Sequence, residues 1–247
     1  MLHSPVIQPR WGALNALPVF HYICRGLGVG RSSTFASGLS RAGTLGRPST
    51  RHLLAKGISF LINPPVVAAV VFVAVTVGLE GRAERYGLLV AICLFFGVVL
   101  PTGYVWMLKI RGQIEDLFIP VTRDRRGPLL FGSLSFLLGT AALTWASASP
   151  VLLALMFCYA ANGLLLAGIS FRWKISLHAV GAWGPLAALC FLVGPQALFL
   201  IPVPIVVSWA RVELGSHTFS QVSAGGALSV CLTWLIFSLV VGVPPSG

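Results

Sequence analysis

Residues 129–170 read LLFGSLSFLLGTAALTWASASPVLLALMFCYAANGLLLAGIS and contain no charged side chain. A helix that crosses a bilayer needs about 20 mostly apolar residues, so this stretch is long enough to cross twice. The sequence Ser-Ala-Ser-Pro at 147–150 interrupts it near the middle, where a turn is favoured. We therefore predict two membrane-spanning helices, at 129–147 and 150–170.

The rest of the chain has the same apolar character. Of its 247 residues, 56% are hydrophobic and 9% are charged, and the mean hydropathy is +0.89. A soluble domain carries about 25% charged residues, so a soluble fold is excluded. We expect an all-α, multi-pass integral membrane protein of the bacterial cytoplasmic membrane, with a bundle of about six to seven transmembrane helices over residues 58–243. The remaining predicted spans are 58–79, 87–108 and 222–243, with shorter helices at about 175–193 and 196–210 around Gly194–Pro195.

Residues 1–57 form a separate leader that is basic and free of acidic residues. They hold seven of the 17 lysines and arginines, and the first carboxylate of the chain is Glu80. Such a leader is a disordered tail, upstream sequence added by a wrongly assigned start, or an organelle transit peptide, which would place the protein in an organelle membrane. Its basic residues come without a soluble fold to organise them, so we do not expect nucleic acid as a partner.

Three polar segments interrupt the apolar sequence, at 109–128, 171–177 and 211–221. Even numbers of predicted spans separate them, so all three are expected on the same face of the membrane. The five cysteines are scattered and form no CxxC pair, so neither a disulfide framework nor a metal site is indicated. A site that uses the three segments would therefore rely on charged and imidazole side chains.

Each segment carries a short basic motif, and two of them add a histidine. Charge this close to hydrocarbon is costly, which indicates a partner or a function. Guanidinium groups match the geometry of phosphate, and imidazole transfers protons near neutral pH. Together they favour a phosphate site. The motifs are Arg123-Asp-Arg125-Arg126-Gly-Pro128, Lys174-Ile-Ser176-Leu-His178 and Arg211-x5-His217-x3-Gln221.

In this order the motifs resemble those of the type-2 phosphatidic acid phosphatase superfamily, which contains lipid phosphatases and haloperoxidases. Its members share a Lys/Arg-rich motif ending in Arg-Pro, a Ser-Gly-His motif, and Ser-Arg-x5-His-x3-Asp. The resemblance covers about residues 58–243 and is strongest from Trp209 to Gln221. It implies a metal-independent and cofactor-free phosphoric ester or diphosphate hydrolase. The apolar setting suggests a lipid substrate, phosphatidate or an isoprenyl phosphate or diphosphate, whose chain stays among the membrane lipids.

The resemblance also implies the catalytic roles. His217 would be the nucleophile that forms a phosphohistidine, and Gln221 would orient its ring. His178 would protonate the leaving alkoxide and then activate water. The alternative for His217 is a helix-end histidine that is satisfied by a backbone carbonyl.

The remaining motif residues would bind the phosphate. Arginine and lysine would supply fixed positive charge, and a serine would donate a hydrogen bond. The arginines of the first motif can instead anchor a cytoplasmic loop, and the lysine can extend to the lipid headgroups. The expected phosphate-binding residues are Arg211, Lys174, Ser176 and one or two of Arg123, Arg125 and Arg126, with Arg123 and Arg126 favoured.

Four departures from the family pattern indicate that the resemblance is to a divergent, bacterial-type branch. Gln221 stands where the family has Asp, and Leu177 stands where it has Gly. A glycine separates Arg126 from Pro128, and two predicted spans separate the first and second motifs. These departures favour an alternative function, a catalytically silent protein of the same fold that binds or transports a lipid phosphate.

Overall fold

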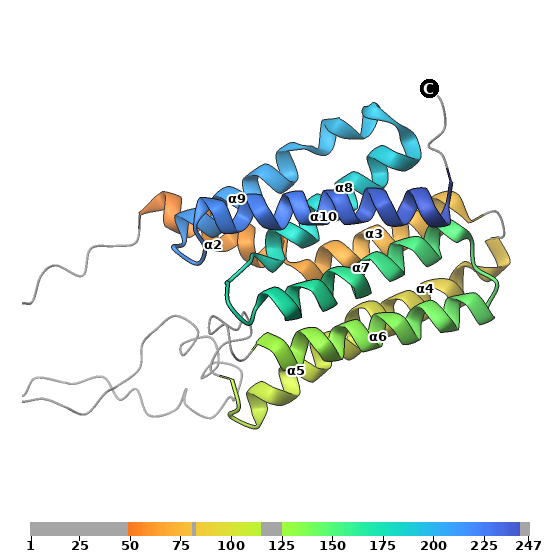
Figure 1. Cartoon of the computed structure of the whole chain (residues 1–247), viewed down its shortest axis with the longest axis horizontal. Coiled ribbons are helices and arrows are strands. Elements are labelled where there is room, and N and C mark those ends of the chain that lie inside the picture. Colours follow the sequence, from red (N-terminus) through yellow and green to blue (C-terminus); the bar gives the residue numbers. More distant parts are fainter. Residues whose placement is uncertain (1–48, 81–82, 115–124, 243–247) are drawn as a thin grey trace, which may run out of the picture. The chain divides into compact units, whose positions relative to one another are not determined.

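The computed structural model describes residues 49–80, 83–114 and 125–242, and the secondary structure in these ranges is helical. Expectations for the leader up to residue 48 and for Arg123 lie outside the described residues. The elements, in chain order (Figure 1), are α2 (Thr50–Leu61), α3 (Pro64–Leu79), η1 (Ala83–Arg85), α4 (Tyr86–Leu94), the π-helical η2 (Phe95–Val99), α5 (Leu100–Ile110), α6 (Arg126–Trp145), α7 (Pro150–Ile169), α8 (Leu177–Val193), η4 (Pro195–Leu200), α9 (Pro202–Glu213) and α10 (Phe219–Val240).

Within the described ranges, five helical stretches are long and apolar enough to cross a membrane, and a sixth is obtained if α2 and α3 count as one bent span. The helix α8 is also apolar but shorter. An all-α fold with five or six long apolar helical stretches that could span a membrane is therefore confirmed, as is the pair of helices on either side of Pro150. The five stretches are Ala83–Ile110, Arg126–Trp145, Pro150–Ile169, Pro195–Glu213 and Phe219–Val240.

The first predicted span, 58–79, is not one helix. It is replaced by α2 and α3, which meet at a 47° bend, and α2 begins at Thr50 inside the predicted leader. Pro64 and Pro65 explain the break, because proline lacks an N–H and its ring clashes with the preceding helical turn. Asn63 caps the new helix: its Oδ1 accepts from the backbone N–H of Val66 at 2.9 Å.

Glycines allow α8 and α10 to pack closely, as expected for helices in a membrane. A Cβ on Gly226 would lie 2.8 Å from Trp183 Cδ1, and a Cβ on Gly225 would lie 3.0 Å from the backbone oxygen of Ser176. Because Gly225 touches the start of α8, the contact fixes the second motif against the beginning of α10. These glycines are explained by packing.

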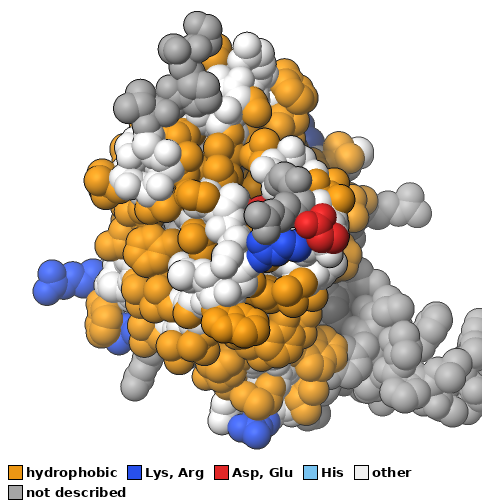
Figure 2. All heavy atoms as spheres, turned by 90° about the vertical axis from the view of Figure 1, so that its right-hand side faces the viewer, with side chains coloured by type: hydrophobic (Ala, Val, Ile, Leu, Met, Phe, Trp, Pro, Cys, Tyr) orange, Lys and Arg blue, Asp and Glu red, His pale blue; other side chains and the backbone are white. Residues whose placement is uncertain are grey.

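The helix ends divide into two groups (Figure 1). The α5–α6, α7–α8 and α9–α10 connections lie at one end of the helices, together with α2. The turns α3–α4, α6–α7 and α8–α9 lie at the other end, which Figure 2 shows as mostly hydrophobic with few charged side chains. The described parts of all three polar segments therefore share one end of the bundle.

Candidate functional site

Four charged or imidazole side chains from the three motifs are buried at the end that carries the polar segments. Their exposed fractions are 5% for Arg125, 7% for His178, 6% for Arg211 and 6% for His217. All four line one cavity of about 410 Å³. Residues up to 92 positions apart along the chain are thus brought to one place: Arg125 from the first motif and His217 from the third.

The C-terminal turn of α9 sets the spacing of the third motif. The backbone N–H of Ser216 donates to the carbonyl of Arg211 at 3.1 Å, and the N–H of Gly215 donates to that of Val212 at 2.9 Å. This is the Schellman arrangement, which needs a left-handed residue, and Gly215 supplies it with φ of 62°. The N–H of His217 also reaches the Arg211 carbonyl, at 3.2 Å. The turn therefore places the arginine and the histidine side by side.

Arg211 is held by a residue that the sequence did not reveal. Its Nη1 donates to Ser59 Oγ at 2.6 Å, and Ser59 is buried on α2. The side chain of His178 makes a hydrogen bond to the backbone of the same Ser59. The helix α2 packs against α9, so one short helix positions side chains from both the second and the third motif.

The first motif contributes Arg125 to the cavity. The Nη1 of Arg125 donates to the carbonyl of Ile175 at 3.4 Å, which ties the start of α6 to the second motif. The guanidinium carbon of Arg126 instead lies 3.6 Å from the centroid of the Phe171 ring, in a cation–π contact. Successive residues of a helix point about 100° apart, so only one of two adjacent arginines can face the cavity. Of the two predicted phosphate ligands in this motif, Arg126 stacks on an aromatic ring and Arg123 lies outside the described residues.

The ring of His217 is held in one orientation. Its Nδ1 lies 3.1 Å from Gln221 Oε1 and 3.3 Å from the backbone oxygen of Lys174. The N–H of Thr218 donates to the same Oε1 at 3.2 Å, which identifies this atom as the amide oxygen. Both neighbours of Nδ1 are therefore acceptors, so Nδ1 carries the ring proton and Nε2 carries a lone pair.

Gln221 belongs to the capping box that begins α10. The Thr218 hydroxyl accepts from the backbone N–H of Gln221 at 3.4 Å, while the Gln221 side chain accepts from the backbone N–H of Thr218. A capping box satisfies N–H groups that the first helical turn leaves without partners. The same two bonds fix the amide against His217. Gln221 therefore lies where an orienting residue is expected, although it brings no negative charge.

The cations at this end disfavour further positive charge. Burial, then Arg125 and Arg211, lower the pKa of His217 from 6.5 to about 4. Burial and the charge of Arg211 lower the pKa of Arg125 to about 10, and burial with both arginines also lowers the pKa of Lys174. His217 is therefore neutral at physiological pH, in the form that carries the Nε2 lone pair. A bound anion would relieve the mutual repulsion of these groups.

The second motif is split between the cavity and the helix cap. His178 and Leu177 line the cavity, so the leucine between the motif's serine and histidine faces the site. Ser176 is fully buried, and its Oγ accepts from the N–H of Ala179 at 3.4 Å as the N-cap of α8. Among the described residues that line the cavity, neither Ser176 nor Lys174 occurs. Lys174 contributes its backbone carbonyl and its nearby charge.

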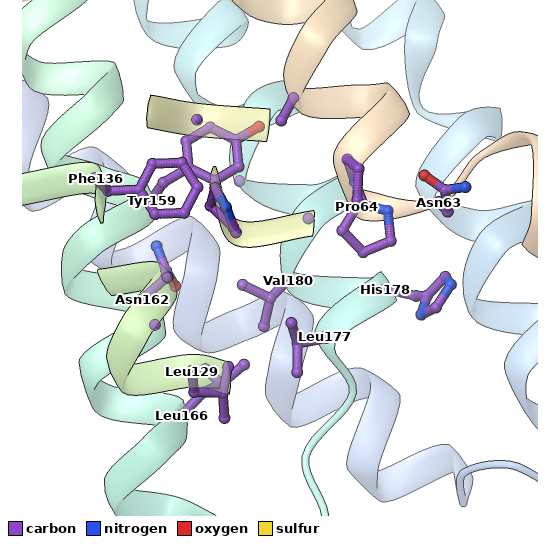
Figure 3. Close-up of a pocket in the computed structure, with 18 of the residues that line it drawn as sticks. Asn63, Pro64, Leu129, Phe136, Tyr159, Asn162, Leu166, Leu177, His178 and Val180 are labelled. Carbon is purple, nitrogen blue, oxygen red and sulfur yellow. The ribbon is translucent and has the colours of Figure 1, made fainter. Parts of the chain in front are cut away.

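Beyond the basic end the cavity is apolar. Figure 3 shows His178 on one side of it, with Leu129, Leu166 and Asn162 on the other and Phe136 and Tyr159 further along. Leu129 and Leu166 belong to one cluster of buried side chains that joins α6, α7 and α8. The cavity thus joins a cationic end to a body that suits hydrocarbon.

Comparisons with known proteins do not add to this description. No family model, no curated protein and no solved structure matches the chain. Within the described ranges, no three His, Cys, Asp or Glu side chains gather as a metal site would require.

Proposed function

We propose that the protein hydrolyses a phosphate monoester or diphosphate of a lipid through a phosphohistidine on His217. The observation that carries the proposal is the pair of oxygen neighbours at Nδ1 of this ring. Its Nδ1 faces two oxygen acceptors, so the lone pair of Nε2 is available beside Arg125 and Arg211. A neutral imidazole held in this way is a nucleophile, and the surrounding cations draw a phosphate group to it.

The reaction would proceed in two steps. In the first, Nε2 of His217 attacks phosphorus and the bond from phosphorus to the lipid oxygen breaks. The leaving oxygen takes a proton from His178, which is neutral before phosphate binds and takes up this proton when the bound phosphate anion offsets the charges of Arg125 and Arg211. In the second, water attacks the phosphohistidine, His178 takes a proton from that water, and the phosphorus–nitrogen bond breaks to release inorganic phosphate. Arg125 and Arg211 would hold the equatorial oxygens in both steps, with the charge of Lys174 nearby.

The apolar body of the cavity supports a lipid as the substrate. A phosphate at the basic end leaves the attached chain among Leu129, Phe136 and Leu166, which line the cavity further in. Removing apolar surface from water stabilises a bound chain by about 25 cal/mol per Å². A water-soluble phosphate ester would gain no binding free energy from this part of the cavity. The substrate would therefore come from the lipids of the surrounding membrane.

A second function is favoured by one feature, the amide at Gln221. An imidazole that becomes phosphorylated carries positive charge, and a carboxylate stabilises that charge better than an amide does. A protein that only binds or transports a lipid phosphate needs the cations but not the charge on this residue. The alternative is therefore a silent binder that uses Arg125 and Arg211 in the same cavity.

Phosphate release distinguishes the two functions. The full chain, purified in detergent, is given phosphatidate, lysophosphatidate and geranylgeranyl diphosphate, and inorganic phosphate is measured. The phosphatase proposal predicts release from at least one of them and loss of release in His217→Ala. The matched control is His52→Ala, on α2 and away from the cavity, which should keep wild-type release. Binding of these lipids with no release by any of them would favour the silent binder and contradict the phosphatase.

A further inference from the structure

Two polar atoms in the apolar body of the cavity have no hydrogen-bond partner among the described residues. They are the hydroxyl of Tyr159 and Oδ1 of Asn162. Asn162 is only 6% exposed, and its Nδ2 donates to the carbonyl of Cys158 at 2.9 Å. That bond identifies Nδ2 as the nitrogen, so the unsatisfied atom is the oxygen. Buried polar atoms are costly to leave without a partner, and most of them have one.

Other polar side chains of the same cavity are satisfied by the protein. The hydroxyl of Ser133 donates to the carbonyl of Leu129 at 2.8 Å, and that of Ser229 donates to the carbonyl of Val180 at 3.0 Å. Asn63 uses both ends of its amide, on Val66 and on Phe60. Tyr159 and Asn162 thus differ from their neighbours, which indicates that their partner is something other than the protein.

Tyr159 and Asn162 lie on the same face of α7. They are three positions apart, so they share a face of the helix, and both line the cavity (Figure 3). The Tyr159 ring packs 5.3 Å from the Phe72 ring and 5.2 Å from the Phe136 ring, centroid to centroid. The ring is packed against these neighbours, and its hydroxyl has no partner among the described residues. Asn162 and Tyr159 lie about 10 and 15 Å along the helix axis from its end at Ile169.

We propose that Asn162 and Tyr159 form a polar subsite for the part of the lipid that follows its phosphate. Oδ1 of Asn162 can only accept a hydrogen bond, whereas the Tyr159 hydroxyl can donate one. A hydroxyl or an amide N–H and C=O on the lipid satisfies both. The subsite therefore selects lipid phosphates that carry such a group between the phosphate and the hydrocarbon chain, such as a monoacylglycerol phosphate, over isoprenyl phosphates, whose chains offer no donor or acceptor. This inference rests on the proposed binding of a lipid phosphate at Arg125, Arg211 and His217.

Two conservative variants test the subsite. Tyr159→Phe and Asn162→Leu remove the polar atoms and keep the apolar bulk. Phosphate release is measured for the full chain with oleoyl-glycerol phosphate and with geranylgeranyl phosphate. Wild type should prefer the former, and each variant should lose about tenfold in kcat/KM on it with little change on the latter. The control is Ser133→Ala, whose hydroxyl lines the same cavity but is already bonded to the backbone, and this change should not alter the preference.

Binding is measured separately, so that the subsite is tested even without turnover. The melting temperature of His217→Ala is recorded with each of the two lipids, alone and combined with Tyr159→Phe or Asn162→Leu. Selective stabilisation by oleoyl-glycerol phosphate that disappears in the double variants supports the subsite. Equal stabilisation by both lipids, or equal losses with both lipids in the variants, contradicts it and means that a water molecule satisfies the two atoms. Absence of phosphate release by wild type with this binding pattern intact would contradict the phosphatase and leave the subsite standing.

Discussion

The two ends of the helical bundle use charged side chains in different ways. At the end that carries the α3–α4 and α6–α7 turns, Arg85 Nη1 donates to the carbonyl of Ser147 at 3.2 Å, and Glu80 Oε1 accepts from the N–H of Ser149 at 2.9 Å. These bonds join one turn to another. At the end that carries the motifs, Arg125 and Arg211 are buried beside a cavity, and the charge of Arg211 lowers the pKa of Arg125. Charge at one end stabilises turns, and charge at the other end is concentrated where an anion can bind.

The largest difference between the ends is expected from one substitution made at each. Arg211→Lys keeps the charge but loses the planar fork, and we expect phosphate release to fall about a hundredfold. Arg85→Lys, at the opposite end, should change release less than about twofold. Steady-state rates in the same detergent provide the measurement. Similar losses in both variants would show that the arginine at the cavity has no special part in catalysis.

A negative charge on the orienting residue should sharpen the comparison. Gln221→Asp places a carboxylate beside Nδ1 of His217, where it stabilises the positively charged ring of the phosphorylated state, and we expect turnover to rise about tenfold. Gln196→Asp adds the same charge to η4 at the other end and should leave turnover unchanged. The rates of phosphate release are compared at saturating lipid. If Gln221→Asp lowers turnover as an ordinary disruptive change would, the orienting role is wrong.

A smaller effect is expected from α2. Ser59→Ala removes the acceptor of Arg211 Nη1, and we expect a loss of about fivefold in kcat/KM, which corresponds to about 1 kcal/mol, the net contribution of one ordinary hydrogen bond. Thr144→Ala, near the far end of α6, removes a hydroxyl that bonds within its own helix and should have no effect on kcat/KM. Ser59→Thr, which keeps the hydroxyl, should recover most of the loss. If Ser59→Thr does not recover kcat/KM, the loss in Ser59→Ala comes from the packing around residue 59 and not from its hydroxyl.

A separate effect concerns the dependence of stability on pH. The pKa of His217 is lowered from 6.5 to about 4, so between these values the unfolded chain binds a proton that the folded chain does not. Its contribution to stability is complete above about pH 6.5 and is lost as the pH falls toward 4. We expect His217→Gln to reduce the fall in melting temperature between pH 7 and pH 5 by about 4–7 °C, which corresponds to about 1.8 kcal/mol. An unchanged pH response in His217→Gln would show that the ring is not held neutral by its surroundings.

Much of the fold could be predicted because membrane spans are defined by local composition. To predict the spans on either side of Pro150, it was enough to find an uncharged stretch long enough for two spans with a turn signal near its middle. The break at Asn63 was visible in the sequence Asn-Pro-Pro, but hydropathy alone gave one continuous helix over 58–79. The helix α2 crosses residue 57, where the predicted leader ends, and it is shorter and less apolar than a span.

The sequence could predict only those parts of the site whose residues lie close together along the chain. The spacing of Arg211, His217 and Gln221 is set by one turn and one capping box, both readable from the residues between them. Whether Arg125 or Arg126 faces the cavity depends on the residue at which α6 begins and on the direction in which its first turn points. The sequence does not show either. Ser59 joins the site through a contact with a residue 152 positions away, and no local pattern predicts such a contact.

The most direct test of the central claim is the covalent intermediate on His217. The full chain is mixed with lysophosphatidate labelled with ³²P, quenched in alkali within milliseconds to seconds, and examined for labelled protein. We expect a label that is stable in base and labile in acid, absent from His217→Ala and present in His52→Ala. Phosphate release without any labelled wild-type protein, or an equal label in His217→Ala, would contradict it.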